Sequence, residues 1–476
     1  MAVWLYSTPR RAKTPLQTRR PGRVDFYVCG PTVYDACHVG HARPAVVFDA
    51  VRRYLEYAGH TVNFISNITD IDDKIIRRAG ELGVPCAQLA SRCQDEYERD
   101  MARLGTRSPT VRPRATEHID EMLALAAGLA EKGFAYATPR GLWFDVARFP
   151  GYGGLSGRAA DDDATEHRVE QDPEKRNPQD FALWKAAKPG EPSWPSPWGP
   201  GRPGWHIECS AMAMRYADGE LDIHGGGADL AFPHHENEAA QSEAYSGKPL
   251  ARHWMHNGFI TVGGGEGEGG KMGKSKGNAF RLRDAFEIAP PAALRLWVLG
   301  THYRMPLAYR PELLTQNAAA LARLSGACAA LALAMRAAGP AAPAADGPAA
   351  QAAADADARF RAAMDDDFNT PQALASVHEL ATRANAASTP GSGAGPADLA
   401  ALAATLFAHM GVLGLPLEPP RTGAGDAKGF VELLLALRGE ARAAKDFALS
   451  DRIRDGLSAL GVEVLDRAGQ TDWKMK

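Results

Sequence analysis

The stretch Cys29-Gly-Pro-Thr-Val-Tyr-Asp-Ala-Cys-His38-Val-Gly-His41 leads from a strand-like segment into a helix-like segment through a turn that carries Gly40 and two histidines. Such a turn points backbone N–H groups and the positive end of a helix at whatever binds there, which suits phosphate. The two histidines stand at positions i and i+3, on one side of the first helical turns. Cys29 lies just upstream, where it can hold a metal. The stretch therefore predicts a nucleotide and a metal-held second substrate at one site.

A His-x-Gly-His pattern with a cysteine before it also arises by chance, so this prediction needs support from elsewhere in the chain. Three further segments, 66–74, 204–238 and 271–278, carry polar or potential metal-binding residues in contexts that a simple core does not require.

Length and charge limit the classes of protein that fit. A chain of 476 residues with 45% hydrophobic and 23% charged residues is typical of a soluble protein with two to four domains. The formal net charge of −3 excludes a purely electrostatic nucleic-acid binder, so any RNA contact must come from local patches. Basic residues gather near the start, an arrangement more typical of a solvated face: Arg10, Arg11, Lys13, Arg19, Arg20 and Arg23.

Cysteine usage indicates a reducing compartment, because the six cysteines are sparse and lack the spacing of a disulfide framework. The first residues contain no apolar signal-peptide segment, so we expect a cytoplasmic protein. We expect no membrane span either, since Arg323, Arg336 and several prolines interrupt the alanine-rich runs.

Strand-like and helix-like segments alternate early in the chain, which predicts an α/β fold with a parallel sheet. The expected elements are a strand at 23–29, a helix at 41–58, a strand at 61–66, helices within 90–135, a strand at 219–225 that ends in three glycines, and a helix that Pro233 begins and Gly247 follows. Residues 136–200 have an irregular pattern that is typical of an insertion.

The second half of the chain is expected to be mainly helical. Alanine-rich helices follow residue 310 and are interrupted at 338–349 and 388–396. A final unit, 426–476, combines helices at 433–444 and 450–460 with a short strand at 462–465.

Four residues are candidate metal ligands: Cys29, Cys209, His234 and Glu238. His234 and Glu238 are four residues apart on one expected helix and share a face. Two thiolates, an imidazole and a carboxylate form an acceptable zinc set. Spacing alone leaves the alternative open that both cysteines are small core residues and the helix start is solvated.

A second phosphate-binding candidate is the loop Gly270-Lys271-Met-Gly-Lys274-Ser275-Lys276-Gly277-Asn278. Its lysines supply charge that can close over a polyphosphate as negative charge builds on the leaving group. A P-loop is excluded, because that pattern needs glycine where this chain has Glu268. A plain solvated lysine loop remains the alternative.

Several motifs together resemble a known family. His38-Val-Gly-His41 and Lys271-Met-Gly-Lys274-Ser275 are similar to the two signature motifs of class I aminoacyl-tRNA synthetases. The segments between and after them resemble cysteinyl-tRNA synthetases specifically, so that the resemblance covers nearly the whole chain: Asn67-Ile-Thr-Asp-Ile-Asp-Asp-Lys74, Gly204-Trp-His-Ile-Glu-Cys209, Asp222-Ile-His-Gly through His234-His-Glu-Asn-Glu238, Asp365-Asp-Asp-Phe-Asn-Thr-Pro371 and Asp446-Phe-Ala-Leu-Ser-Asp.

The resemblance implies that Cys29, Cys209, His234 and Glu238 hold one Zn²⁺, which binds the thiolate of the substrate L-cysteine. A hydrophobic pocket separates such similar substrates by only about 1–3 kcal/mol, whereas thiolate is a much better zinc ligand than the hydroxyl of serine. A site with four protein ligands is normally structural, so the coordination must expand, or Glu238 must loosen, when the thiol arrives.

The resemblance also assigns the remaining site residues. It places Thr69 and Trp205 beside the amino acid, and Gly227 and Asp229 at the adenosine. His38 and His41, with Gly40 between them, then stabilise the phosphates of Mg²⁺-ATP during the attack of the cysteine carboxylate. Lys271 and Lys274 assist the departure of pyrophosphate, after which the cysteinyl group passes to tRNA(Cys).

The domain division that follows from the resemblance has five parts. These are a split nucleotide-binding domain at 1–115 and 200–255, a connective insertion at 116–199, a lysine-loop and stem-contact region at 256–310, a helical tRNA-binding domain at 311–420 and a small anticodon-binding domain at 426–476. We expect a monomer.

Gly273 departs from the family pattern, which usually has serine there, and the change should cost about 1 kcal/mol of loop closure. Three alternatives remain at this point: a related ligase that joins cysteine to an amino sugar, a non-catalytic RNA-binding paralogue and a purely structural zinc protein.

Overall fold

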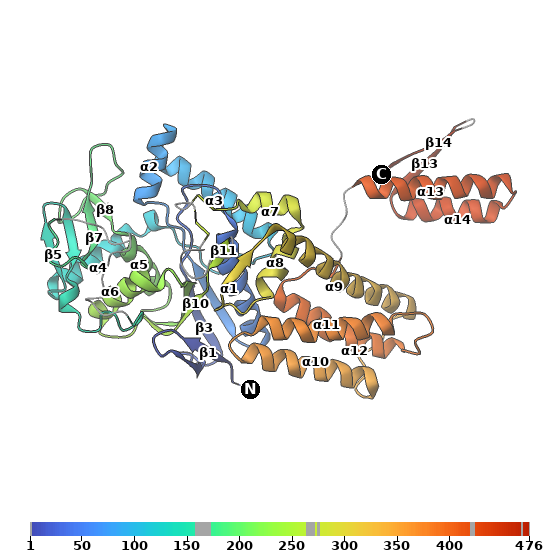
Figure 1. Cartoon of the computed structure of the whole chain (residues 1–476), viewed down its shortest axis with the longest axis horizontal. Helices are drawn as coiled ribbons and strands as arrows, with labels where there is room; N and C mark the ends of the chain where they lie inside the picture. Colours follow the sequence, from blue (N-terminus) through green and yellow to red (C-terminus); the bar gives the residue numbers. More distant parts are fainter. Residues whose placement is uncertain are drawn as a thin grey trace. The chain divides into compact units, whose positions relative to one another are not determined.

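A four-stranded parallel sheet in the order β10-β9-β3-β4 forms from the expected alternation of strands and helices (Figure 1). Its strands are β3 (Arg23–Val28), β4 (Thr61–Ser66), β9 (Leu221–Gly227) and β10 (Ala251–Asn257). The α/β fold class is confirmed. Three of these strands lie within two residues of their expected positions, and only β10 was not predicted.

The computed structural model describes residues 2–157, 173–262, 272–273, 277–418, 424–467 and 470–475. The chain divides into two compact units, 1–419 and 420–476. Lys271 and Lys274 of the predicted lysine loop lie outside the described residues.

Both faces of the sheet are covered, and β3 shows how the sequence achieves this. Phe26 packs in the core that contains α1 (Val39–Tyr57), while Tyr27 packs in a separate core with α5 (Trp205–Tyr216). Neither residue is exposed. A strand covered on both sides reads as a nearly continuous apolar run, which is typical of parallel sheets.

The direction of the crossovers reverses between β3 and β9. Helix α1 connects β3 to β4 on one side, and α6 (Glu236–Ser246) connects β9 to β10 on the other. In open α/β sheets, ligands bind outside the carboxyl ends of the strands at such a switch point. Cys29 and Gly227 stand at this edge of the sheet.

The expected start of α6 at Pro233 was wrong. A π-helical turn, η3 (Ala231–His235), precedes α6, and Phe232 within it has an extended backbone with φ −140° and ψ 136°. The regular helix therefore begins only at Glu236 and ends, as expected, before Gly247.

The insertion is more ordered than its sequence suggested. Helices α2 (Asp73–Leu82) and α3 (Cys86–Arg103) precede the insertion. The insertion itself contains α4 (Ile119–Glu131) and the strands β5 (Ala135–Thr138), β6 (Gly141–Phe144) and β7 (Phe181–Ala186), and β8 (Gly201–Pro203) completes their antiparallel sheet just after its expected end. The expectation of irregular structure over 136–200 was wrong. These strands are short, and β6 is buried along its whole length, so the alternation that identifies a half-buried strand is missing.

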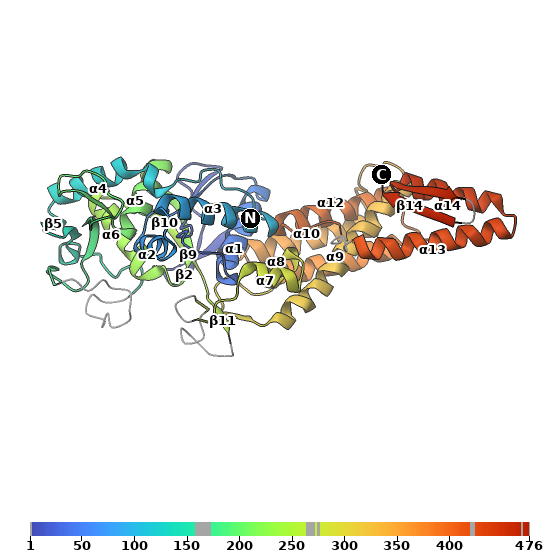
Figure 2. The ribbon, with the colours of Figure 1, turned by 90° about the horizontal axis from the view of Figure 1, so that it is seen from above.

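After β10, the first unit consists mainly of helices. The elements are β11 (Ile260–Val262), α7 (Leu282–Ile288), α8 (Pro291–Leu299), β12 (Leu307–Tyr309), α9 (Pro311–Ala338), α10 (Gly347–Asp365), α11 (Thr370–Ala387) and α12 (Pro396–Leu413). Helices α9 to α12 form a bundle that lies on the opposite side of the parallel sheet from the insertion (Figures 1 and 2).

Two of the bundle helices, α9 and α12, are long and apolar enough to cross a membrane by length and composition. This corrects the expectation that no segment approaches a membrane span. Both helices contribute apolar side chains such as Leu321 and Leu406 to the bundle core, which accounts for their composition.

The second unit contains a helical pair and a hairpin: α13 (Ala424–Ala443), α14 (Phe447–Ala459), β13 (Val462–Arg467) and β14 (Gln470–Met475). Val431, Leu457 and Val462 form its small core. The two expected helices and the strand at 462–465 are confirmed, whereas β14 was not predicted.

An N-terminal hairpin of β1 (Trp4–Ser7) and β2 (Ala12–Pro15) precedes the sheet. Three of the basic residues near the start do not simply face solvent. Arg19, Arg20 and Arg23 all pair with the fully buried carboxylate of Asp25, at 3.3, 2.9 and 3.1 Å. The interpretation of this cluster as a solvated face was therefore only partly right.

A buried ion pair joins α1 to the helical region. Asp49 of α1 accepts hydrogen bonds from Arg295 of α8 and from Arg53, and the Arg295 side chain is not exposed. Arg295 also donates to the carbonyl oxygen of Leu413 at the end of α12, at 2.6 Å. Burial opposes ionisation of Asp49, but the two arginines outweigh it and lower the pKa of this carboxyl group.

We predict that Asp49→Asn destabilises the protein by about 3–5 kcal/mol, because it leaves the buried Arg295 charge without a counter-charge. The melting temperature and the urea midpoint at neutral pH measure the loss. The lowered pKa stabilises the fold above the unfolded value of about 3.9 and ceases to do so as the pH falls through the folded value. The gap between wild type and variant should therefore shrink below about pH 4, and an unchanged gap there would contradict the assignment.

Candidate active site

The four predicted metal ligands converge at the carboxyl edge of the sheet. The Sγ atoms of Cys29 and Cys209 are 3.7 Å apart, and Cys29 Sγ is 3.3 Å from Glu238 Oε1. His234 Nε2 lies 3.0 Å from the same carboxylate oxygen. All four ligand atoms lie within 4.8 Å of one another, so the residues present fit one metal ion.

Different elements position each ligand. Cys29 follows β3, and its N–H donates to the carbonyl oxygen of Gly225 in β9 at 3.2 Å. Cys209 lies in α5, whereas His234 lies in η3 and Glu238 in the first turn of α6. His234 and Glu238 keep their i, i+4 relation across the boundary between η3 and α6, because the non-helical residue Phe232 precedes both of them.

A second set of donors shares two residues with the first. Cys29, His224, His235 and Glu238 also bring their ligand atoms within 4.8 Å of one another. The first set offers two sulfurs, which zinc prefers, so it is the better zinc site. In the second set, His224 Nε2 approaches Glu238 Oε2 at 2.8 Å and holds that carboxylate from its other side.

Sequence reasoning missed His224. It lies on β9 within Asp222-Ile-His-Gly, a segment that carried the family resemblance, but no ligand spacing marked it. The side chain has no exposed surface and stacks on Trp254, with ring centroids 4.4 Å apart.

The electrostatics of the site favour a cation. A hydrogen bond from Cys29 lowers the pKa of Cys209 to about 6, whereas burial and the neighbouring Cys209 raise the pKa of Cys29. Burial opposes ionisation of Glu238, but His224 and His234 hold its pKa well below the usual value. Negative groups crowded in a buried place are neutralised well by a bound dication.

Trp205 and Thr69 flank the metal site. The Trp205 ring stacks on His234 with ring centroids 4.2 Å apart and an interplanar angle of 24°. Thr69 is 2% exposed, and its hydroxyl accepts from Asn67 Nδ2 at 3.4 Å. An apolar ring and a small hydroxyl thus lie beside the two elements that supply the sulfurs.

His38 and His41 shape the N-terminus of α1. His38 is the N-cap, and its Nδ1 accepts from the Gly40 N–H at 3.0 Å, while the His38 N–H donates to His41 Nδ1 at 3.1 Å. A Cβ at position 40 would lie 2.6 Å from the His38 ring, so only glycine fits. The motif therefore builds a capped helix start in which the ring centroids of His38 and His41 are 4.0 Å apart.

The segment after the lysine loop runs along this helix start. The Val39 N–H donates to the Phe280 carbonyl oxygen, and the Leu282 N–H donates to the Cys37 carbonyl oxygen, both at 2.9 Å. Cys37 itself is 6% exposed and packs in the core. Of the loop, the structure describes Met272, Gly273, Gly277 and Asn278, and the Met272 N–H donates to the Ile260 carbonyl oxygen at 2.8 Å.

Gly227 and Asp229 form the turn that follows β9. The Leu230 N–H donates to the Gly227 carbonyl oxygen at 2.9 Å, and the Ala228 N–H donates to the Asn257 carbonyl oxygen at 2.8 Å. The Asp229 carboxylate folds back so closely over Gly227 that a side chain there would collide with it. This turn lies at the same edge of the sheet as Cys29.

Comparison with known proteins agrees with this geometry. Residues 15–319 match the family model described as tRNA synthetases class I (C) catalytic domain, and residues 359–418 match the DALR domain. The cysteine–tRNA ligase of Laribacter hongkongensis is 48% identical over 478 residues, with 99% of each chain covered. That of Geobacter sulfurreducens is 46% identical over 490 residues, with both chains covered completely.

Solved structures share the fold at low identity. The methionyl-tRNA synthetase of Mycobacterium tuberculosis bound by methionyl-adenylate is 17% identical with a TM-score of 0.59, over 82% of this chain and 90% of that chain. A leucyl-tRNA synthetase from Agrobacterium radiobacter K84 in a ternary complex reaches a TM-score of 0.60 at 10% identity, over 86% and 88% of the two chains. With full-length identity of 46–48% to curated relatives, the chain belongs to the cysteine–tRNA ligases of the class I tRNA synthetase family.

Proposed function

We propose that this chain activates L-cysteine with ATP at the carboxyl edge of its parallel sheet and transfers the cysteinyl group to tRNA(Cys), with Zn²⁺ held by Cys29, Cys209, His234 and Glu238. The observation that supports the zinc assignment is the convergence of four ligand atoms within 4.8 Å, drawn from three distant stretches of sequence. As a member of its family the chain is a ligase, and the proposal concerns how its residues act.

The donor set suits selection of a thiol. Packing alone separates cysteine from serine by only about 1–3 kcal/mol. Zn²⁺ bound here supplies a soft Lewis acid that prefers thiolate to hydroxyl. Trp205, stacked on His234, then limits the size of the side chain that fits, and Thr69 offers a polar contact to the amino acid.

The first turn of α1 serves the nucleotide. His38 and His41 hold the phosphates of Mg²⁺-ATP at the positive end of α1, while the cysteine carboxylate attacks the α-phosphorus. The bond from that phosphorus to the bridging oxygen breaks, and pyrophosphate leaves with the help of Lys271 and Lys274. Gly227 and Asp229, in the turn that follows β9, meet the adenosine.

The helical part of the chain positions the RNA. We assign the bundle at 311–420, which includes the DALR match at 359–418, and the unit at 426–476 to contacts with tRNA(Cys). The region 256–310 carries the lysine loop and meets the acceptor stem. The split catalytic domain at 1–115 and 200–255 and the insertion at 116–199 complete the division.

We further propose a cytoplasmic monomer. The structure contains no disulfide among the six cysteines, which suits a reducing compartment. The alternatives considered from sequence are not favoured, because identity to cysteine–tRNA ligases extends over the whole chain, including the C-terminal unit.

Removing one sulfur tests the metal site. Cys209→Ser should lower the zinc content of the purified chain from near one ion to a small fraction, because serine is a poor zinc ligand. Cys328→Ser is the matched control, since Cys328 is a buried cysteine in the core of α9, away from the site. Metal analysis of both proteins measures the effect, and full zinc retention by Cys209→Ser would contradict the ligand set.

The lysine loop is tested by pyrophosphate exchange. Lys274→Ala should lower cysteine-dependent ATP–pyrophosphate exchange by about two orders of magnitude, because a positioned charge on the leaving group is lost. Zinc content serves as the control and should not change. Exchange close to the wild-type rate would refute the role of this lysine.

Deletion of 420–476 separates the two steps. The first unit has its own cores, so the shortened chain should form cysteinyl-adenylate at the wild-type rate. Transfer to tRNA(Cys) should fall sharply, because contacts to the RNA are lost. Equal losses in pyrophosphate exchange and in transfer would show that the second unit has no separate role.

A further inference from the structure

The motif Asp365-Asp-Asp-Phe-Asn ends helix α10 in a turn whose role the proposed mechanism leaves open. Asp367 and Phe368 both adopt left-handed backbone conformations, with φ 62° and 50°. Residues other than glycine adopt this conformation at a cost, so the surroundings must hold the turn in place. Phe368 is 1% exposed and packs edge-on against Tyr54 of α1.

The three carboxylates of this motif have different partners and different burial. Asp365 accepts from the Tyr54 hydroxyl at 2.5 Å, and Asp366 pairs with Lys13 at 2.6 Å. Asp367 is fully buried, although it is the residue with the left-handed backbone. The left-handed turn thus points one carboxylate inward while its neighbours stay nearer the surface.

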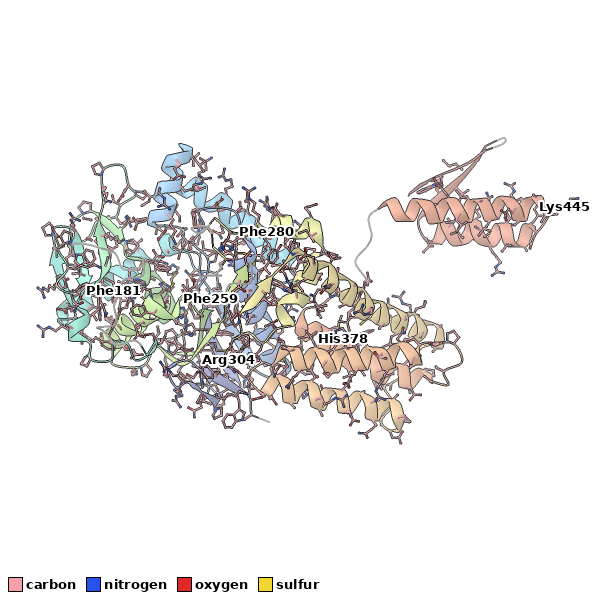
Figure 3. All side chains as sticks on the ribbon, viewed as in Figure 1. Phe181, Phe259, Phe280, Arg304, His378 and Lys445 are labelled. Atoms are coloured by element: carbon pink, nitrogen blue, oxygen red, sulfur yellow. The ribbon has the colours of Figure 1, made fainter. Side chains whose placement is uncertain are left out.

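Asp367 also binds a second turn, residues 302–305, which lies between α8 and β12. Its Oδ1 accepts from the Tyr303 hydroxyl at 2.7 Å, and its Oδ2 accepts from Arg304 Nε at 2.7 Å. The Tyr6 N–H of β1 donates to Oδ1 at 2.8 Å. One buried carboxylate therefore ties the end of α10 to the N-terminal hairpin and to the turn at 302–305. Figure 3 labels Arg304 together with Phe259, which precedes β11.

The turn at 302–305 supports both signature elements of the active site. The Gly258 N–H donates to the Tyr303 carbonyl oxygen at 2.8 Å, just before β11, whose partner strand β12 begins at Leu307. β11 in turn holds Met272 of the lysine loop through the carbonyl oxygen of Ile260.

Arg43 connects the same turn to the histidine motif. It lies in α1, two residues after His41, and its buried guanidinium donates to the carbonyl oxygens of Phe259, Tyr303 and Met305. The turn at 302–305 is therefore held by hydrogen bonds from Arg43 of α1 and by hydrogen bonds to Asp367. A shift of this turn moves β11 relative to the start of α1.

We propose that Asp367 is a positioning residue for cysteine activation: its carboxylate fixes the turn at 302–305, and this turn sets the place of β11 and β12 relative to the first turns of α1. The inference rests on the proposed adenylate-forming function. It predicts that loss of Asp367 slows the chemical step although Asp367 lies outside the metal and phosphate sites.

The test is a rapid-quench measurement of adenylate formation by the zinc-loaded full-length chain, with saturating cysteine and varied ATP. The burst amplitude counts active sites, and the burst rate reports their geometry. Asp367→Asn keeps the shape of the side chain and loses the charge that holds Arg304. Its maximal burst rate should fall about tenfold or more, because misplacement of reacting groups by a fraction of an ångström is costly. Amplitude, zinc content and the half-saturating cysteine concentration should stay at wild-type values.

Asp365→Asn and Asp366→Asn are the matched controls, since both belong to the same turn and neither contacts 302–305 in the hydrogen bonds above. Their burst rates should remain within about twofold of wild type, as is usual for changes away from a critical contact. Equal slowing by all three variants would assign the effect to docking of the bundle instead.

Tyr303→Phe is a milder second variant, which keeps the buried ring and removes one hydrogen bond to Asp367. It should also lower the burst rate, but by less than Asp367→Asn does. If Asp367→Asn does not fold, the burst rate of Tyr303→Phe is the test of the proposal. Burst rates of wild-type size in both variants, with only the amplitude reduced, would overturn the proposal. A wild-type chain that forms no cysteinyl-adenylate at all would instead refute the proposed function itself.

Discussion

The hydrogen bond from the Cys29 N–H to the Gly225 carbonyl oxygen extends the pairing of β3 with β9 to the carboxyl edge of the sheet. Nearly two hundred residues separate these two strands in the sequence. A slip of one residue would turn every side chain of β3 to the opposite face and remove Cys29 from Cys209. The convergence of the four candidate metal ligands thus depends on this one register.

The two halves of the site come from opposite layers of the fold. Cys29 packs with the core that contains α5 and α6, whereas His38 begins α1, which covers the other face of the sheet. Ligands supplied by different layers can meet only beyond the strand ends, at the point where the crossovers change direction. This explains why a buried, sulfur-rich cluster lies close to a helix start suited to phosphate.

The sequence predicted the parallel sheet and the four candidate ligands, but it did not predict the sheet of the insertion or the role of His224. The continuous apolar runs and the turn at His38–His41 predicted the parallel sheet, and the family resemblance predicted which four ligands converge. The sheet of the insertion escaped prediction because strands such as β6 are buried on both faces and lack alternation. His224 escaped prediction because it acts across space, through the second oxygen of Glu238, and no spacing in the sequence records that contact.

Helix α1 makes polar contacts with several other parts of the molecule along its length. His38 caps its N-terminus, and further along it presents Arg43 to three backbone carbonyl groups, Asp49 to Arg295 and Tyr54 to Asp365. Irregular turns leave carbonyl groups that must find donors once they are buried. A guanidinium with five donors satisfies several of them at once and in one fixed geometry, which an apolar side chain of equal volume cannot do. Buried charges along α1 therefore define where the surrounding turns lie, and through them where the reacting groups lie.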